Sequence, residues 1–496
     1  SRTVSKLQKQ RSVKPQVMIK RASRRFMSNK KSFATPHAAE RQHGPGSSQM
    51  HIRNWKGRMA SGVQVYQNAA KRVVNNVGLG KSTLHDQQYY QELSKIPYCG
   101  NAARDEFMNR YLEEIRGSYA AQSKQSCAEL ESALELVDKV WIEKEGSVPE
   151  AGTSKELKKK YDEVVRKVQD AHVPKVYAVP GTGSFEYLEQ AIRMVFSQRT
   201  ICFSIDVEAF EFNTNVITEI GISVYDPRES VFSTVPNVRN YHLIVGESLQ
   251  LRNRKFVCDF KDCFILGESM VMSLANCVEF IQSLINYYMV PVTAEDATWN
   301  RAFVGHNVKG DLKWLGNIGV EIPRKLDHAL TVYKRSGKAS VPPNPAATPG
   351  PTTSAAVAVL DTEKLYQVCF GNRGCNLGKV LRLLRLPHAF LHNAGNDAHY
   401  TLKLLLHMCD INFRRHTQLD DFTVMSDRIR GWFAREREER KVLPMSYSMA
   451  LSEFKSSSSS NSNKKKHTVS QTEFGGCRWY GSAGEALVAA GRGGHV

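Results

Sequence analysis

The stretch ICFSIDVE, residues 201–208, is a short and mostly apolar run that ends in two acidic residues. This composition predicts a buried β-strand with Asp206 and Glu208 at its carboxyl end. Side chains at positions i and i+2 of a strand project to the same face, so both carboxylates are expected to point at one spot. Open α/β sheets place ligands beyond the carboxyl ends of their strands, which makes this spot a candidate functional site.

Two further acids are predicted near helix N-termini. The sequence GHNVKGD, residues 305–311, places Asp311 in the first turn of a helix that follows a strand. The sequence HNAGND, residues 392–397, places Asp397 in the first turns of another helix, five residues after His392. An acid at the end of a core strand loses its contact with water, which is unfavourable for its charge. A bound cation can offset this cost. Oxygen ligands without accompanying cysteines suit Mg²⁺ or Mn²⁺ rather than zinc.

Outward from this stretch, apolar runs of strand length alternate with segments of helix length. Alternation of this kind predicts an α/β fold, a sheet with helices packed on it. The predicted strands are residues 201–207, 217–225, 241–245 and 357–360, and the predicted helices are 271–289, 309–315, 376–386 and 394–407. We assign this domain to residues 176–412.

Two segments interrupt or follow this domain. Residues 339–356 are rich in Ala, Pro and Thr and are expected to form an exposed insertion loop. Residues 413–445 are predicted as a C-terminal helix. The remaining residues, 446–496, contain a Ser run, three consecutive lysines and a Gly/Ala-rich end, and we expect a disordered low-complexity tail.

Residues 86–175 read as a helical accessory region. Apolar residues recur at helical spacing in three stripes, over 107–115, 130–141 and 157–168. Such stripes usually form buried core rather than a site. A protein partner that binds through this region is a further expectation.

The formal charge of +19 is concentrated near the start of the sequence. Residues 1–85 hold 18 Lys and Arg and a single acid, Glu40, whereas residues 86–445 are close to neutral. This composition predicts a disordered basic arm. A solvated tail, an arm that binds nucleic acid through its phosphates, and an organelle transit segment are all compatible with it. The sequence opens at Ser1 rather than Met, so we expect that residues precede it.

Composition excludes several other classes. No stretch approaches 18 consecutive apolar residues, so a membrane-spanning helix is not expected. The ten cysteines include no C-x-x-C pair, which argues against a zinc protein and a disulfide scaffold. The expected location is the cytoplasm or the nucleus, or the mitochondrion if the arm is a transit segment.

The three acidic motifs together resemble a known family. Asp-x-Glu, then Asn-x-x-x-Asp, then His-x-x-x-x-Asp, in this order over residues 206–397, is similar to the DEDDh 3′→5′ exonucleases of the ribonuclease H-like superfamily. The sequence ITEIG at 217–221 and Asp361-Thr362 agree with the pattern. Residues 251–253, 267–269 and 392–398 further resemble the fungal QIP-like branch. The resemblance covers about residues 200–412 and implies a ribonuclease H-like mixed sheet flanked by helices.

The resemblance also implies a mechanism. Asp206, Glu208, Asp311 and Asp397 would hold two Mg²⁺ or Mn²⁺ ions, and His392 would act as general base. One ion would activate a water and the other would stabilise the departing 3′-oxygen. The implied activity is hydrolysis of single-stranded 3′ ends, of RNA more than of DNA, to nucleoside 5′-monophosphates.

Each residue also has an ordinary structural interpretation. Asp311 would cap its helix, Asp397 would be a surface acid, and His392 would be a hydrogen-bonded structural histidine. His306, His388 and His399 are taken as structural, and Asp327 and Asp361 as loop or strand-end acids. Phe210 and Phe212 either belong to the core or stack on a terminal base.

Two other functions compete with an RNA exonuclease. One is a catalytically idle scaffold with the same fold that binds nucleic acid or protein. The other is a DNA exonuclease in repair.

Overall fold

The structure, a computed structural model, describes residues 92–149, 154–172, 178–229, 236–253, 255–331, 356–371, 374–439 and 477–492. The predicted basic arm and nearly all of the predicted insertion loop lie outside these ranges. Among the described helices, none has both the length and the apolar character that a bilayer span requires.

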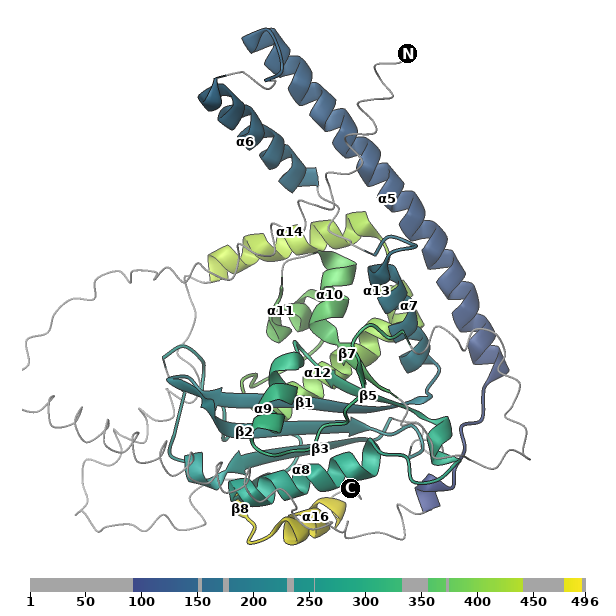
Figure 1. Cartoon of the computed structure of the whole chain (residues 1–496), viewed down its shortest axis with the longest axis vertical. Coiled ribbons are helices and arrows are strands. Elements are labelled where there is room, and N and C mark those ends of the chain that lie inside the picture. Colours follow the sequence, from purple (N-terminus) through teal and green to yellow (C-terminus); the bar gives the residue numbers. More distant parts are fainter. Residues whose placement is uncertain are drawn as a thin grey trace, which may run out of the picture. The chain divides into compact units, whose positions relative to one another are not determined.

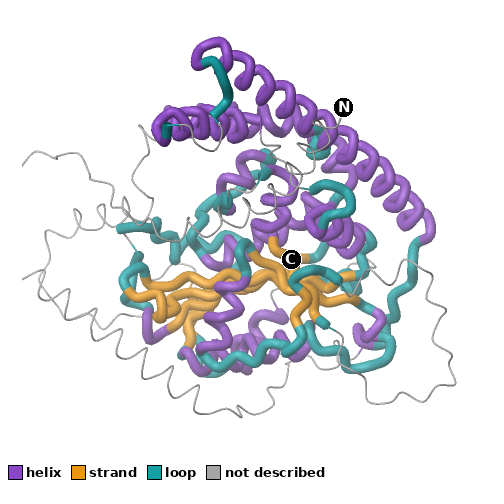
Figure 2. Tube along the Cα trace, turned by 45° about the horizontal axis from the view of Figure 1, so that its top comes forward, coloured by secondary structure: helices purple, strands orange, loops and turns teal. Residues whose placement is uncertain are grey.

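A mixed sheet of eight strands organises the described chain (Figures 1 and 2). Its order is β6-β7-β5-β1-β2-β3-β4-β8, and β2 runs antiparallel to both of its neighbours while the other pairs are parallel. The strands are β1 (Thr200–Phe210), β2 (Asn213–Tyr225), β3 (Val238–Val245), β4 (Ser269–Met272), β5 (Asn300–Gly305), β6 (Leu326–Asp327), β7 (Val357–Asp361) and β8 (Cys477–Trp479). The carboxyl ends of β1, β5 and β7 therefore meet at one edge of the sheet.

Helices cover both faces of the sheet, as expected for the ribonuclease H-like fold (Figure 1). One face carries α7 (Gly183–Phe196), α10 (Thr362–Phe370), α11 (Leu377–Leu383) and α12 (Ala394–Cys409). The opposite face carries α8 (Leu274–Tyr288), α9 (Lys309–Asn317) and α16 (Ala483–Arg492). Short 3₁₀ turns lie at Gly246–Ser248 and Asp296–Thr298. The predicted fold class is confirmed.

Strand β1 divides its side chains between the two faces. Ile201, Phe203 and Ile205 belong to the core cluster under α8, whereas Cys202 belongs to the cluster under α12. Successive strand residues alternate faces, so Asp206 and Glu208 share the α12 face with Cys202.

Two glycines allow α12 to approach the sheet closely. A Cβ atom on Gly221 of β2 would lie 1.8 Å from the carbonyl oxygen of Ala394, and one on Gly395 would lie 2.7 Å from the His242 side chain. No other residue fits without displacing the helix.

The first two predicted apolar stripes belong to one continuous helix, α5 (Ala102–Glu145). It begins with Asn101, whose side chain accepts a hydrogen bond from Arg104, and ends at Gly146 in the left-handed region at φ 82°. The third stripe forms α6 (Lys155–His172), which packs against α5.

A buried polar network holds the first half of α5 against residues 414–420, the segment that follows α12. The fully buried guanidinium of Arg414 donates hydrogen bonds to the Tyr111 and Tyr119 hydroxyls and to the Asp420 carboxylate. Both tyrosine hydroxyls also donate to Asp420, at 2.5 and 2.9 Å. Removing one member would leave buried polar groups without partners, so the network fixes the helix firmly.

Two sequence predictions about the end of the chain need correction. The C-terminal helix expected within 413–445 is α14 (Phe422–Glu439), but residues 413–417 belong to a separate helix, α13 (Ile411–Thr417), because Gln418 adopts a left-handed conformation at φ 53°. Of the tail expected to be disordered at 446–496, the structure describes residues 477–492, and these form β8 and α16, so the prediction is wrong for this segment. Ala483, Ala486 and Leu487 recur at helical spacing and are buried, a pattern masked by the small size of the side chains.

The helix predicted at 271–289 is also partly wrong. Strand β4 occupies its start, and α8 begins after Ser273, whose hydroxyl accepts a hydrogen bond from the Asn276 N–H. A continuous apolar run does not distinguish a buried strand from a buried helix.

The close contact between α12 and β2 generates a stability prediction. Gly221→Ala should lower the free energy of unfolding by about 1–3 kcal/mol, as overpacking does in other cores. Chemical denaturation of the purified protein measures this change.

Gly117→Ala is the matched control. Gly117 lies in α5, and a Cβ atom added there would have no atom of a neighbouring element within 4 Å. Alanine at this position should therefore stabilise the protein by roughly 0.5–1 kcal/mol. Equal effects at the two positions would contradict the close-approach argument.

Candidate active site

The site is built on the carboxyl end of β1. Asp206 and Glu208 project towards α12, and the Ser204 hydroxyl donates a 2.8 Å hydrogen bond to the Ala398 carbonyl on that helix. Glu208 lies opposite Glu219 of β2 in the strand register. The sheet thus fixes the backbone that carries the first two carboxylates.

Asp311 reaches β1 from the neighbouring strand connection. After β5 the chain turns at Asn307, a left-handed residue at φ 67°, and α9 begins. Asp361, at the end of β7, accepts the Asn307 N–H at 3.0 Å and also the N–H groups that start α10. Asp311 Oδ1 in turn accepts the Val207 N–H at 3.1 Å, which holds its carboxylate at the β1 backbone between residues 206 and 208.

Asp397 and His392 come from the start of α12. The backbone N–H of His392, a left-handed residue at φ 68°, donates to Asp397 Oδ2 at 2.9 Å. Asn393 begins the helix, and its side-chain oxygen accepts the Asn396 N–H. The helix start therefore sets the histidine and the carboxylate relative to each other.

The structure brings the ligand atoms of three of the five predicted site residues together. Ligand atoms of Glu208, His392 and Asp397 all lie within 4.8 Å of one another, and His392 Nδ1 is 3.8 Å from Glu208 Oε1. Asp311 lies outside this group of three but is held at strand β1 by the Val207 N–H, and its charge acts on Glu208. Asp206, two residues before Glu208 on the same face, likewise acts electrostatically on Glu208 and Asp397.

The four carboxylates repel one another where water screens them poorly. Burial, with Glu219 nearby, raises the pKa of Asp206 to about 7, and burial with Asp206 nearby raises the pKa of Asp311 to about 8. Burial and the neighbouring acids also raise the pKa values of Glu208 and Asp397 well above their ordinary range. An uncompensated cluster of this kind opposes folding.

The donor set fits a divalent cation. Oδ1 of Asp397 is buried and has no hydrogen-bond partner in the described structure. Glu208 and His392 supply ligand atoms beside it, and hard carboxylate oxygens suit Mg²⁺ or Mn²⁺. A cation here would satisfy the free oxygen and neutralise the repulsion.

Sequence reasoning missed a buried polar chain behind the carboxylates. Glu219 Oε2 contacts His242 Nε2 at 3.0 Å and accepts the Ala394 N–H at 3.4 Å, and His242 Nδ1 lies 2.8 Å from the Ser269 hydroxyl. The side chains of Glu219, His242 and Ser269 are all buried. A signal was present in the sequence, because Glu219 is the one charged residue of strand β2.

The loop between β3 and β4 is tied to the start of α12. Asn393 donates to the carbonyls of Phe260 and Lys261, and Asn396 donates to the carbonyl of Cys263 and accepts the Ile265 N–H. These two asparagines hold the loop over the helix end that carries His392.

The other predicted residues have structural contacts. His306 bonds to the Thr362 hydroxyl and the Cys375 carbonyl, His388 to the Leu386 carbonyl, and His399 to Asn240. Asp327 accepts the Ala329 N–H. Phe210 is buried, whereas Phe212 is 46% exposed.

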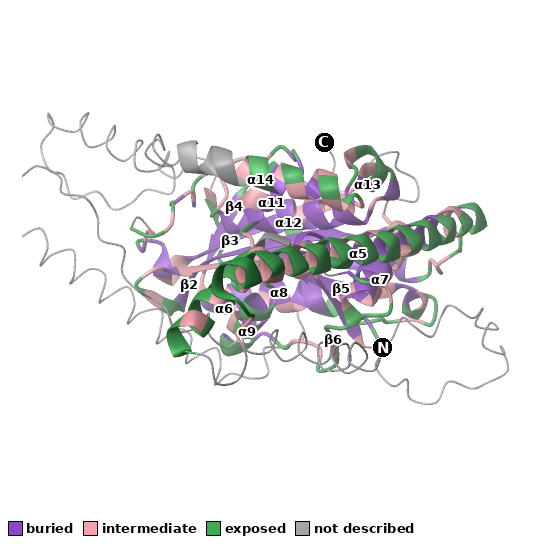
Figure 3. Cartoon of the chain, turned by 90° about the horizontal axis from the view of Figure 1, so that it is seen from above, coloured by how far each residue is buried: buried purple, intermediate pink, exposed green. Residues whose placement is uncertain are grey.

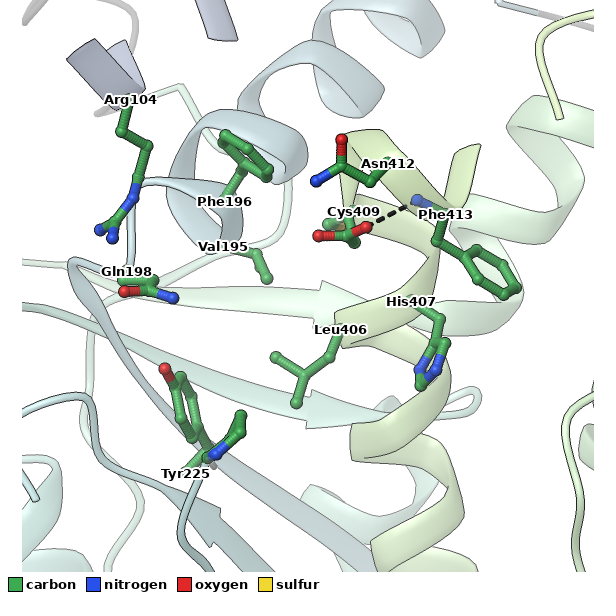
Figure 4. A pocket seen from close by; sticks show the side chains of 12 residues that line it. Arg104, Val195, Phe196, Gln198, Tyr225, Leu406, His407, Cys409, Asn412 and Phe413 are labelled. Atoms are coloured by element: carbon green, nitrogen blue, oxygen red, sulfur yellow. Dashed lines mark hydrogen bonds between the residues drawn. The ribbon is translucent and has the colours of Figure 1, made fainter. Parts of the chain in front are cut away.

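A separate cavity of about 590 Å³ lies at the opposite end of α12 (Figure 4). Leu406 and His407 line it together with Val195 of α7 and Tyr225, the last residue of β2. Asp397 lies at the first turn of α12, so this cavity is distinct from the carboxylate cluster.

The fold and the carboxylate cluster define the class of the domain. Residues 201–408 match the family model described as DNA polymerase III subunit epsilon-like, C-terminal domain, of DEDDh type. This part of the chain therefore has a fold of the DEDDh exonuclease type.

Relatives of nearly the full length give the family of the whole chain. "Uncharacterized protein YDR514C" of Saccharomyces cerevisiae is 46% identical over 433 residues, which cover 86% of this chain and 87% of the relative. "Good for full DBP5 activity protein 2" of the same yeast is 48% identical over 415 residues, 82% of this chain and 70% of the relative. The chain belongs to the family of these two proteins.

A more distant relative is similar over part of the chain. "Uncharacterized nucleolar protein C2C4.08" of Schizosaccharomyces pombe is 27% identical over 212 residues, which cover 41% of this chain and 67% of the relative.

The raised carboxyl pKa values generate a pH prediction. In metal-free protein, the folded state binds more protons than the unfolded chain between about pH 4 and pH 8, so its free energy of unfolding should fall as pH rises through this window. Asp311→Asn should flatten this slope while its amide oxygen still accepts the Val207 N–H. Urea denaturation in a chelator, at several pH values, measures both.

Added Mg²⁺ or Mn²⁺ should raise the free energy of unfolding of the wild type at high pH. The increase should be smaller for Asp311→Asn. The exposed acid Glu321 supplies the control, Glu321→Gln, which should behave as wild type. A metal-free protein whose stability rises between pH 5 and 8 would contradict the electrostatic account.

Proposed function

We propose that the protein is a metal-dependent 3′→5′ exonuclease that hydrolyses single-stranded RNA ends to nucleoside 5′-monophosphates. The observation that carries the proposal is the meeting of four carboxylates from three elements at the carboxyl end of β1, beside one imidazole. The DEDDh type of the domain supports it.

The four acids would act together as ligands of the cations. Asp206, Glu208, Asp311 and Asp397 would bind two divalent ions, which neutralise phosphate charge and activate water when bound. Asp361 and Asn393 position these acids by fixing the turns before α9 and within the His392 loop.

His392 is suited to take a proton. Its side chain is about half exposed, so substrate and water can reach it, and desolvation lowers the pKa of the imidazole below its ordinary value. A neutral imidazole at physiological pH accepts the proton of an attacking water. The His392 backbone N–H meanwhile holds Asp397.

Exposed aromatic rings near the β1 end suit an unpaired strand. Phe212 and Phe256 are 46% and 69% exposed, with ring centroids 6.1 Å apart, and Lys255 lies over the Phe256 ring. Unpaired bases stack on such rings at about 1–3 kcal/mol per base. Lys255 would add attraction for the phosphates.

The competing functions have less support. An idle scaffold has no reason to keep four acids that repel one another. A nuclear location agrees with the name of the nucleolar relative. Membership of the QIP-like branch, drawn from residues 251–253, 267–269 and 392–398, remains a prediction.

An assay on end-labelled strands tests the proposal. The wild-type protein with Mg²⁺ should shorten a 5′-labelled single-stranded RNA stepwise from its 3′ end, faster than the matching DNA. His392→Ala should lower the rate by about 10²–10⁴-fold, as expected for loss of a general base, and Asp206→Ala should lower it by orders of magnitude.

Glu321→Gln is again the control and should degrade RNA at the wild-type rate. Failure of the wild type to shorten either strand, with Mg²⁺ or Mn²⁺ present, would favour the scaffold. Degradation of DNA alone would favour the repair enzyme.

A further inference from the structure

The distal half of α5 and α6 form a two-helix hairpin, and the described side chains of residues 124–145 and 155–169 in it include no buried one. In Figure 3 this hairpin is exposed or intermediate along its length, and the last buried residue of α5 is Ser123. None of the described residues 124–149 and 154–169 is buried. Short helices in water depend on tertiary burial of an apolar stripe for most of their stability.

The two helices share a seam that covers only part of this stripe. The Tyr161 hydroxyl donates to Asp138 at 2.5 Å, and its ring meets Trp141 edge-on at 5.2 Å. Leu136 and Val140 are nevertheless 62% and 42% exposed.

Helical geometry places a third apolar residue beside these two. With about 100° of rotation per residue, Val140 and Leu136 lie roughly 60° and 100° around α5 from the half-buried Val137, on the side that Val164 of α6 also faces. Because Tyr161 contacts Asp138, the antiparallel helices put Val164, 37% exposed, level with Leu136. We call these three residues the hairpin face.

The two helices carry opposite charge. Residues 124–145 of α5 contain six Asp and Glu against three Lys, whereas α6 contains six Lys and Arg against four Asp and Glu. On the side of the hairpin face, Glu129 and Glu143 of α5 border the apolar residues, and Lys160 and Lys167 of α6 border them on the other helix.

We propose that the hairpin face binds the hairpin face of a second copy of this chain, forming an antiparallel four-helix bundle. A twofold axis parallel to the helices sets α5 of each copy against α6 of the other, so acidic flanks meet basic flanks. The alternative twofold axis would set α5 against α5 and bring like charges together. Charge therefore selects one of the two symmetric arrangements.

Helix length agrees with this arrangement. Residues 124–145 of α5 and the 18 residues of α6 are of similar length, about 33 and 27 Å at 1.5 Å per residue. The pairing would cover Leu136 with Val164 of the second copy, which is the packing typical of bundle cores.

The proposed dimer also determines where the sheet-containing domains of the two copies lie. The Arg414 network locks the first half of α5 to its own domain, and the helix continues unbroken into the hairpin. A twofold axis along the bundle places both domains at the same end. The proposal does not depend on the nuclease activity.

Light scattering on the full chain tests the proposal. At micromolar concentration the wild type should have twice the monomer mass of 55.8 kDa. Leu136→Glu with Val140→Glu should give the monomer mass and keep the helical circular dichroism of the domain. Val292→Glu, at a 67% exposed valine outside the hairpin, is the matched control and should stay dimeric.

A charge swap tests the pairing of α5 with α6. Glu129→Lys with Glu143→Lys reverses α5, and Lys160→Glu with Lys167→Glu reverses α6. Each variant alone should be monomeric, and an equimolar mixture should form a heterodimer.

Three results would overturn the proposal. They are a monomeric wild type, a dimer that the Leu136 and Val140 substitutions leave intact, and swapped variants that do not recombine. A wild-type monomer that binds a different helical protein counts as a monomeric wild type and also overturns the proposal.

Discussion

The close contact between the start of α12 and strand β2 is the constraint that makes the site possible. Gly221 leaves space for the Ala394 carbonyl, and Gly395 leaves space for His242. Only this approach brings Asp397, nearly 200 residues after the first motif, to the acids of β1. The contact is steric, and it fixes the place of the histidine loop as well.

The assembled cluster is electrostatically unfavourable, and the surrounding structure holds it in place. Backbone N–H groups of Val207 and His392 each donate to a site carboxylate, and Asp361 and Asn393 fix the turns that carry them. Behind the site, Glu219 and His242 join β2 and β3 to α12. A divalent cation is the natural counter-charge for such a group.

Much of this arrangement was predictable from the sequence because the acids follow or precede regular elements. Asp206 and Glu208 end an apolar run, and Asp311 and Asp397 occupy first turns of helices, so the local pattern fixes their place in the sheet. The role of Glu219 was not predictable in the same way, because its partners His242 and Ala394 come from distant parts of the chain. The ordered segment at 477–492 was missed because small side chains give little periodic signal. The boundary between strand β4 and helix α8 within 271–289 was not predicted, because a fully buried apolar run has the same composition in a strand as in a helix. Only Ser273, whose hydroxyl caps α8, marks the start of the helix.

Crystals soaked in Mn²⁺ would show whether the carboxylates gather around a cation, because manganese is located by its anomalous scattering. We expect an anomalous peak in contact with the carboxylates of Glu208 and Asp397. Its absence from Asp206→Ala or Asp397→Asn crystals would agree with this assignment. Manganese bound elsewhere in the wild type, with no peak at these carboxylates, would contradict it.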